Sequence, residues 1–361
     1  MRILRADDFY FPVRFTHIPE RLQRGDAITA GTIEWGEMLG IIARNSASRD
    51  HYKAMLCGPL ATLGWPRATA EYQQIISDTL CTVFAIDDMC DGDAPEETRS
   101  MYGSAEALFS DLVEFWFEGD DFAPPSFGTP LYTAMRDLRY RLIKAGASEL
   151  WIRRFAQSMQ GWFDGVRKEK AFKKHEIVPD ADALMHLRPD SGAVYLFMNF
   201  IEGGNHIQVP EDAWRDERFE RLRTIAGRLI VYPNEIWSFK KESEGGHSIN
   251  IITSLMLHAE MQLEQAIVYV AEMHNSEMIS FDELAKSILA SPDTDARVRI
   301  YIRGLQHLMF GAFVWGLSAT RYSKDFFASE AISGEKSSAS QSRLRCAAPS
   351  PSTRPSIRRT S

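Results

Sequence analysis

The chain has 361 residues, of which 45% are hydrophobic and 11% are aromatic, so it can bury one large core. Acidic residues outnumber basic ones by 49 to 41, and the formal net charge is -8. This balance excludes a general affinity for polyanions such as DNA, and it favours a small molecule as the partner.

In chain order, an irregular arm of about 25 residues that contains Pro12, Pro19 and Gly25 is expected to precede a long series of helices. Apolar residues then recur at spacings of three and four, which predicts helices, and the two-residue alternation typical of strands is nearly absent. The expected helices cover about residues 32–56, 68–89, 104–118, 131–145, 148–174, 181–202, 212–241, 248–275, 281–289 and 297–318. The sequence therefore predicts an all-α fold, a single-domain helical bundle.

The composition changes near the C-terminal end. After about Ser329 the chain is rich in Ser, Arg and Pro and has almost no large apolar residues, so nothing offsets the entropy of ordering it. We predict a folded domain over residues 1–328 and a disordered tail over residues 329–361.

Several features predict a reduced cytoplasmic setting. The four cysteines, Cys57, Cys81, Cys90 and Cys346, show no C-x-x-C spacing, and the chain begins without a basic and apolar leader. The longest nearly apolar stretches, such as residues 308–319, are shorter than the roughly 20 residues that a bilayer requires. No membrane span is expected.

Three carboxylates stand at the C-terminal end of the expected helix 68–89. Asp87 and Asp91 share a helix face through their four-residue spacing, and Asp88 lies about 100° round from Asp87. Crowded carboxylates at a helix C-terminus repel each other and oppose the helix dipole, so a cation is expected there, and all-oxygen ligands suit magnesium. A solvated acidic helix end that runs into the turn at Gly92 would contain the same residues.

A second polar row lies in the expected helix 212–241 and just beyond it. Asn234, Ser238 and Glu242 are four residues apart, so on a helix they form one polar strip about 12 Å long. An amide oxygen, a hydroxyl and a carboxylate on one strip make a second all-oxygen cation site. The alternative is an amphipathic helix whose polar stripe faces water, and Pro233 either starts this helix or kinks it.

Together, the two motifs resemble those of the class I terpene synthase family, specifically the bacterial-type cyclases. That family carries an aspartate-rich D-D-x-x-D element and a later N-x-x-x-S-x-x-x-E element on facing helices, and this chain has both in the same order. The resemblance implies a class I terpenoid synthase bundle with a central active-site cavity. It also implies three Mg²⁺ ions, with Asp87, Asp88, Asp91, Asn234, Ser238 and Glu242 as their ligands.

The resemblance assigns further residues to the diphosphate of the substrate. Arg188 precedes Asn234 by 46 residues, which is the spacing of the diphosphate-sensing arginine in bacterial-type members, and its planar fork can hold two phosphate oxygens. Lys241 and the pair Arg321 and Tyr322 correspond to other diphosphate donors of the family. As ordinary alternatives, Arg188 and Lys241 would be solvated surface residues, and the Arg-Tyr pair would cap a helix.

Residues after Arg188 resemble a broken helix of the family. Gly192 takes the place of a small residue, and the break turns a backbone carbonyl towards the substrate in the family. Ser191 stands where some relatives have an aspartate that acts as a linker.

The resemblance also implies the reaction. Diphosphate departs from the substrate and leaves a carbocation, which must be shielded from water. Phe84, Trp315 and Phe197 are expected to line the pocket, because aromatic faces stabilise positive charge. Packing in the core is the alternative role for each of these rings.

The predicted function is therefore a magnesium-dependent cyclase that converts farnesyl diphosphate to a sesquiterpene, with isoprenyl diphosphate as its partner and a homodimer as one allowed state. The main alternative is a diterpene cyclase that acts on geranylgeranyl diphosphate. A prenyl diphosphate synthase would carry a second aspartate-rich motif where the Asn234 row stands. A non-catalytic helical protein that binds diphosphate is a further alternative.

Overall fold

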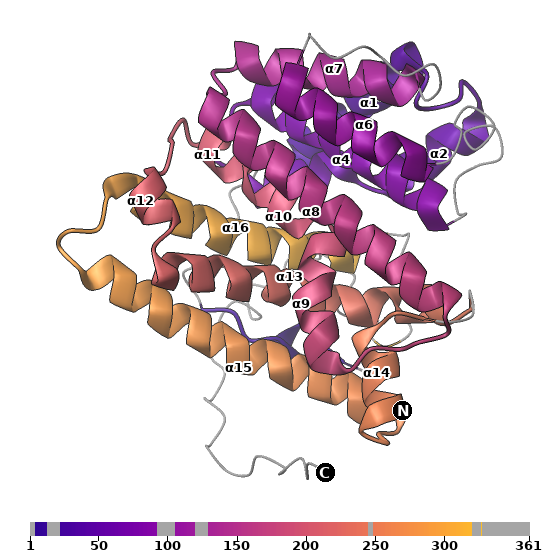
Figure 1. Cartoon of the computed structure of the whole chain (residues 1–361), viewed down its shortest axis with the longest axis vertical. Helices are drawn as coiled ribbons and strands as arrows, with labels where there is room; N and C mark the ends of the chain where they lie inside the picture. Colours follow the sequence, from indigo (N-terminus) through magenta and orange to yellow (C-terminus); the bar gives the residue numbers. More distant parts are fainter. Residues whose placement is uncertain are drawn as a thin grey trace.

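A computed structural model describes residues 4–12, 22–91, 105–119, 129–244, 248–319 and 326. Within these ranges the chain is all-helical, as predicted, and it contains no β-strand (Figure 1). None of the helices described there is long and apolar enough to cross a membrane. The predicted tail, residues 329–361, lies outside the described residues.

A short 3-10 helix, Ala6–Asp8, precedes the α-helices. These are α1 (Leu22–Leu39), α2 (Ser46–Ala54), α3 (Cys57–Gly64), α4 (Ala70–Asp91), α6 (Ala105–Glu118), α7 (Thr129–Lys144), α8 (Glu149–Lys174), α9 (Ala181–Ser191), α10 (Val194–Met198), α11 (Phe200–Gly204), α12 (Glu211–Trp214), α13 (Glu217–Glu244), α14 (Ile251–His258), α15 (Leu263–Ala290) and α16 (Ala296–Ser318).

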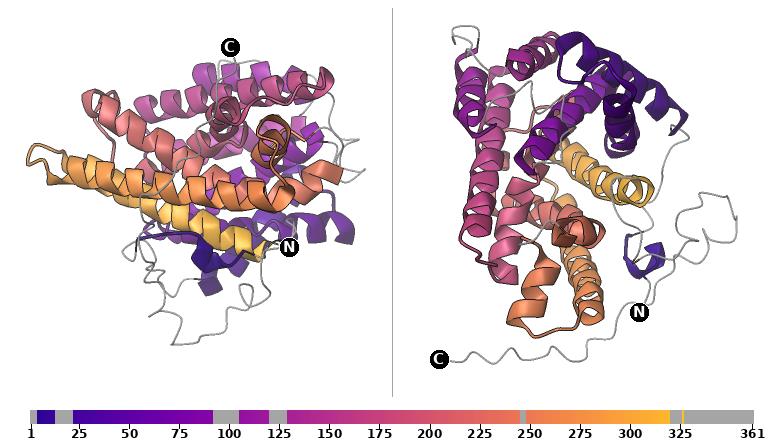
Figure 2. Two further views of the ribbon diagram at one scale, coloured as in Figure 1. Left: turned by 90° about the horizontal axis from the view of Figure 1, so that it is seen from below. Right: turned by 90° about the vertical axis from the view of Figure 1, so that its right-hand side faces the viewer.

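The helices pack in two groups that α8 and α16 join. Figure 1 places α1, α4, α6 and α7 on one side of the bundle and α13 and α15 on the other, and Figure 2 shows the same arrangement from two further sides. Helix α8 contacts both α6 and α9, and α16 contacts both α3 and α13. The middle of the bundle is therefore surrounded by helices from both groups.

Side-chain caps fix the starts of several helices around this middle region. Ser148, Asp180 and Asn250 precede α8, α9 and α14, and each accepts a hydrogen bond from a backbone N–H in the first turn of its helix. Such a cap satisfies an N–H group that has no partner within the helix. These three helices thus begin at positions that their local sequence specifies.

The predicted helix over residues 32–56 is wrong, because two helices occupy this part of the chain. Helix α1 begins at Leu22, so the N-terminal arm is shorter than predicted, and it ends at Leu39. Gly40 follows with a φ of 80°, a left-handed conformation that glycine adopts without strain and that ends a helix. Helix α2 then starts at Ser46, and the short helix α3 was not predicted.

Two other boundaries also differ from the prediction. The expected helix 181–202 is divided, because Ala193 has a φ of 56° between α9 and α10. The expected break between residues 275 and 281 does not occur, and α15 runs through it, since that stretch contains neither Gly nor Pro. The chain instead turns at Glu260, which has a φ of 52°.

The N-terminal segment, residues 4–12, packs on α15 and α16. The side chain of Asn275 accepts a hydrogen bond from the Tyr10 amide at 2.6 Å and donates one to the Asp8 carbonyl at 2.8 Å. The ring centroids of Phe9 and Phe11 both lie 5.1 Å from that of Phe313. This segment therefore closes the side of the core formed by the last two helices.

Candidate active site

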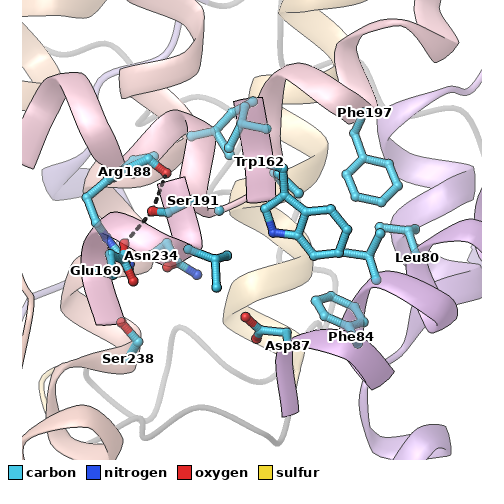
Figure 3. Close-up of a pocket in the computed structure, with 18 of the residues that line it drawn as sticks. Leu80, Phe84, Asp87, Trp162, Glu169, Arg188, Ser191, Phe197, Asn234 and Ser238 are labelled. Atoms are coloured by element: carbon cyan, nitrogen blue, oxygen red, sulfur yellow. Dashed lines mark hydrogen bonds and ion pairs between the residues drawn. The ribbon is translucent and has the colours of Figure 1, made fainter. Parts of the chain in front are cut away.

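A cavity of about 430 Å³ lies in the middle of the bundle, and residues of α3, α4, α8, α9, α10, α13 and α16 line it. Figure 3 shows Glu169, Arg188, Ser191, Asn234 and Ser238 together on one side of it. Leu80, Phe84 and Phe197 lie on the opposite side, and Asp87 lies between the two groups in this view.

On three helices the residues that line the cavity are apolar at first and mostly polar further along the chain, with Trp237 on α13 as an exception. The order is Leu80, Val83, Phe84 and then Asp87 on α4; Ile230, Val231 and then Asn234, Ser238 and Glu242 on α13; Trp162, Val166 and then Glu169, Lys170 and Lys173 on α8. The cavity therefore combines an apolar part with a polar part. A ligand with an apolar body and a charged head group would match both.

The aspartates of the first motif do not share one environment. Asp87 lines the cavity. Asp88 is 2% exposed and is not among the lining residues, and its Oδ2 lies 2.9 Å from Nε2 of His51 on α2. Asp91 is the last residue of α4, and its side chain lies outside the described part of the chain.

The second motif is brought to the cavity as a complete row. Asn234, Ser238 and Glu242 all line it from α13, whose helical course continues through Pro233. Pro233 therefore does not start the helix. Glu242 is held by Asn250, whose Nδ2 donates a hydrogen bond to Oε2 at 3.1 Å.

The donor set on this row fits a divalent metal ion. Ser238 is 5% exposed, and its Oγ has no hydrogen-bond partner among the described residues although it is buried beside the cavity. A buried hydroxyl without a partner is unfavourable, and a bound cation would satisfy it. Within the described ranges, no group of three or more His, Cys, Asp or Glu residues could hold an ion by itself. An ion held by these described residues would also need amide or hydroxyl oxygens, or ligand oxygens, as Mg²⁺ commonly does.

Arg188 sits among three carboxylates at the polar side of the cavity. Its Nε donates to Oε1 of Glu235 at 2.6 Å, and its Nη1 donates to Oε1 of Glu169 at 2.7 Å. Its Nη2 lies 3.5 Å from Oε1 of Glu242. The guanidinium therefore joins α8, α9 and α13 through ion pairs.

These contacts shift the pKa values of both partners. Burial by itself would lower the pKa of Arg188, but the negative charges of Glu235, Glu169 and Glu242 raise it well above its ordinary value. Burial raises the pKa of Glu235 to about 7, although Arg188 acts in the opposite direction. Arg188 therefore keeps its positive charge although it is buried.

The helix break expected after Arg188 is present. Helix α9 ends at Ser191, and Gly192 and Ala193 connect it to α10 while lining the cavity. The Gly192 amide donates to the carbonyl of Arg188 at 2.9 Å, and the left-handed conformation of Ala193 turns the chain. The residues at the break, Gly192 and Ala193, therefore form part of the cavity wall.

The aromatic residues singled out from the sequence also reach the cavity. Phe84 and Trp315 line it and are stacked, with ring centroids 6.0 Å apart and an interplanar angle of 11°. Phe197 lines it from α10, with its ring centroid 6.2 Å from that of Trp65. The indole N–H of Trp315 donates to the carbonyl of Met55 at 2.9 Å, which fixes the ring.

Lys241 lines the cavity as well, whereas Arg321 and Tyr322 lie outside the described residues. Sequence reasoning missed the contribution of α8, from which Glu169, Lys170 and Lys173 reach the polar side. A signal for it existed, since these residues follow Trp162 and Val166 at helical spacing. Without the fold, however, that row looks like any amphipathic helix.

Solved structures share this fold. A linalool/nerolidol synthase from Streptomyces clavuligerus aligns with a TM-score of 0.72 and 22% identity, over 85% of this chain and 99% of that one. An α-eudesmol synthase aligns with a TM-score of 0.70 and 20% identity, over 88% and 99% of the two chains. The bundle is therefore that of class I terpenoid synthases.

Comparisons of sequence agree with this class. The chain is 27% identical to a (+)-T-muurolol synthase from Roseiflexus castenholzii, over 82% of this chain and 89% of that one. It is 26% identical to a germacrene A synthase from Nostoc punctiforme, over 82% and 90% of the two chains. Residues 78–279 match the family model described as terpene synthase family 2, C-terminal metal binding, which covers more than half of the chain. The protein belongs to this family and is a class I terpene synthase with a metal-binding domain.

Proposed function

We propose that the protein is a sesquiterpene cyclase that uses three magnesium ions to ionise farnesyl diphosphate. The observation that carries this proposal is the two-part cavity, with apolar rings such as Phe84 and Phe197 opposite a cluster of oxygen and nitrogen groups around Arg188. An isoprenyl diphosphate has the same two-part character, because its hydrocarbon chain is apolar and its head group is a polyanion.

The proposed metal ligands are the side-chain oxygens of Asp87, Asn234, Ser238 and Glu242. Asp91 remains in the proposed set on the basis of its spacing from Asp87. Asp88 is left out, because it does not line the cavity and its Oδ2 contacts His51. When bound, magnesium would supply Lewis-acid stabilisation of the negative charge on the departing diphosphate.

The diphosphate itself is proposed to be held by cationic side chains. Arg188 and Lys241 line the polar side, and Lys170 and Lys173 are now added from α8. Each can donate charge-assisted hydrogen bonds to phosphate oxygens. Arg321 and Tyr322 retain the same proposed role on the strength of the sequence motif.

Departure of the diphosphate leaves an allylic cation in the apolar part of the cavity. The stacked pair of Phe84 and Trp315 is proposed to present a ring face to that cation and to exclude water from it. Gly192 is proposed to offer a backbone carbonyl at the helix break, where the dipole can stabilise positive charge without forming a bond.

Farnesyl diphosphate is preferred because the (+)-T-muurolol synthase is named for cyclising (2E,6E)-farnesyl diphosphate. The test is incubation of the full chain and magnesium with the ten-, fifteen- and twenty-carbon diphosphates, followed by gas chromatography. Cyclic fifteen-carbon products are the expected result. Preference for the twenty-carbon substrate would make the protein a diterpene cyclase, and absence of turnover with all three would overturn the enzymatic proposal.

Two further experiments test the boundaries of the catalytic domain and the oligomeric state of the enzyme. The catalytic domain is proposed to span residues 1–328 and to act in the cytoplasm, either alone or as a homodimer. A chain that ends at residue 328 should retain turnover, and size-exclusion chromatography with light scattering would give its mass.

A further inference from the structure

Helix α8 approaches the broken end of α9 unusually closely, and two glycines allow this approach. A Cβ atom on Gly165 would lie 2.7 Å from the backbone nitrogen of Ser191 and 2.9 Å from its Cα, distances too short for any side chain. A Cβ on Gly161, one turn earlier, would lie 3.1 Å from Oδ1 of Asp190. Glu169 follows at the same four-residue interval, so the row that touches the end of α9 delivers a carboxylate to it.

One oxygen atom of that carboxylate serves two partners. Oε1 of Glu169 accepts a hydrogen bond from Nη1 of Arg188 at 2.7 Å and another from Oγ of Ser191. The Ser191 hydroxyl also lies 3.5 Å from the carbonyl oxygen of Arg188, and Figure 3 marks both contacts of this hydroxyl. Ser191 is 5% exposed and immediately precedes Gly192. Glu169 therefore connects the guanidinium of Arg188 to the point where the helix breaks.

The other two carboxylates around Arg188 connect it to different places. Oε2 of Glu235 accepts the backbone N–H of Ile251 at 2.7 Å, so that carboxylate ties Arg188 to the start of α14. Glu242 belongs to the proposed metal row and lies further from the guanidinium. Glu169 is thus the carboxylate of this cluster that contacts the break.

We propose that Glu169 is a positioning residue that couples Arg188 to the break at Ser191 and Gly192. This role of Glu169 rests on the proposed function. The Glu169 carboxylate would take the place of the aspartate that some relatives have at the Ser191 position. A serine cannot form an ion pair with Arg188, and here the negative charge comes from α8 instead. When Arg188 turns to a bound diphosphate, the shared oxygen transmits the change to the Ser191 hydroxyl and hence to the backbone that lines the cavity.

The experiment removes the carboxylate at residue 169 and also places a carboxylate at residue 191. Four proteins are compared: the wild-type chain, Glu169→Gln, Ser191→Asp, and the double variant. The matched control is Asp164→Asn, which changes a carboxylate of the same helix that pairs with Arg167 at the surface. Each protein is assayed for kcat and KM with farnesyl diphosphate, for melting temperature, and for binding of inorganic diphosphate with Mg²⁺ by calorimetry.

Glu169→Gln should lower kcat by about 100-fold, since misplacement of a binding group by a distant change has effects of that order. KM and diphosphate affinity should change much less, because Arg188 is still present. Ser191→Asp should lower kcat when Glu169 is intact, because two carboxylates then repel each other, but it should raise kcat in the Glu169→Gln background. This reversal of sign is the signature of a shared coupling role.

Two outcomes would overturn the inference. One is wild-type kcat in Glu169→Gln, and the other is a parallel fall of kcat and melting temperature that Ser191→Asp does not correct, which would mean that Glu169 only supports packing. Failure of the proposed function looks different, because the wild-type chain itself would then turn over none of the diphosphates. The Asp164→Asn control should match the wild type in every measurement.

Discussion

Helices α4 and α13 both carry a metal-binding motif, but they present it to the cavity in different ways. On α13 all three residues of the motif line the cavity, and Asn250 and Arg188 contact one of them, Glu242. On α4, Asp87 lines the cavity, whereas Asp88 does not line it and contacts His51. Residues four apart stay on one helix face, but adjacent residues diverge by about 100°.

This difference shows that a residue can belong to a metal-binding motif without lining the cavity. The repeated four-residue interval on α13 makes a continuous strip, so every member can act on the same ligand. The aspartate-rich motif contains an adjacent pair, and of this pair Asp87 lines the cavity whereas Asp88 does not. We therefore expect substitutions on α13 and at Asp87 to affect turnover strongly, and substitutions at Asp88 to affect it weakly.

The largest expected effect concerns the motif residues that line the cavity on both helices, Asp87 on α4 and Asn234 on α13. Asn234→Ala and Asp87→Ala should each lower kcat by roughly 10²- to 10³-fold, because each removes an oxygen ligand from the groups that stabilise the leaving diphosphate. The melting temperature should change little, since neither substitution opens a large void. Measurement of kcat across a magnesium titration checks the assignment, and full activity of both variants would remove these residues from the metal site.

A smaller effect tests whether α8 also contributes to binding of the diphosphate. Lys170→Gln and Lys173→Gln should each weaken binding of inorganic diphosphate by about tenfold, the effect of losing one charge-assisted hydrogen bond of about 1.5 kcal/mol. Lys174→Gln is the matched control, because Lys174 belongs to the same helix but does not line the cavity. Equal affinity for diphosphate in all three variants would remove Lys170 and Lys173 from the proposed diphosphate donors.

Much of this site could be predicted from the sequence, because helical spacing converts directly into a shared face. The row of Asn234, Ser238 and Glu242 and the helix that carries it followed from the interval of four. The position of Arg188 also followed from its spacing within the family motif. Each of these residues lines the cavity in the structure.

The rest depends on contacts between residues that are distant in the chain. Nothing in the sequence around Glu169 indicates that it meets Arg188 and Ser191, because that contact needs α8 to pack closely on α9 at Gly165. Some helix boundaries were predicted wrongly for a related reason. The left-handed residues Ala193 and Glu260 are not glycines, so tertiary packing rather than local preference places these turns.

The smallest expected effect on turnover concerns Asp88 and completes the comparison. Asp88→Asn should keep kcat within about threefold of the wild type, a change of under about 1 kcal/mol in the barrier, because this side chain does not line the cavity. The same substitution weakens the contact with His51 and should lower the free energy of unfolding by about 1 kcal/mol, measured by urea denaturation. His51→Phe is the companion variant and should lower stability without reducing turnover. If Asp88→Asn instead lowered kcat as strongly as Asp87→Ala, the adjacent pair would both act on the metal, and α4 would have to rearrange when the ligand binds.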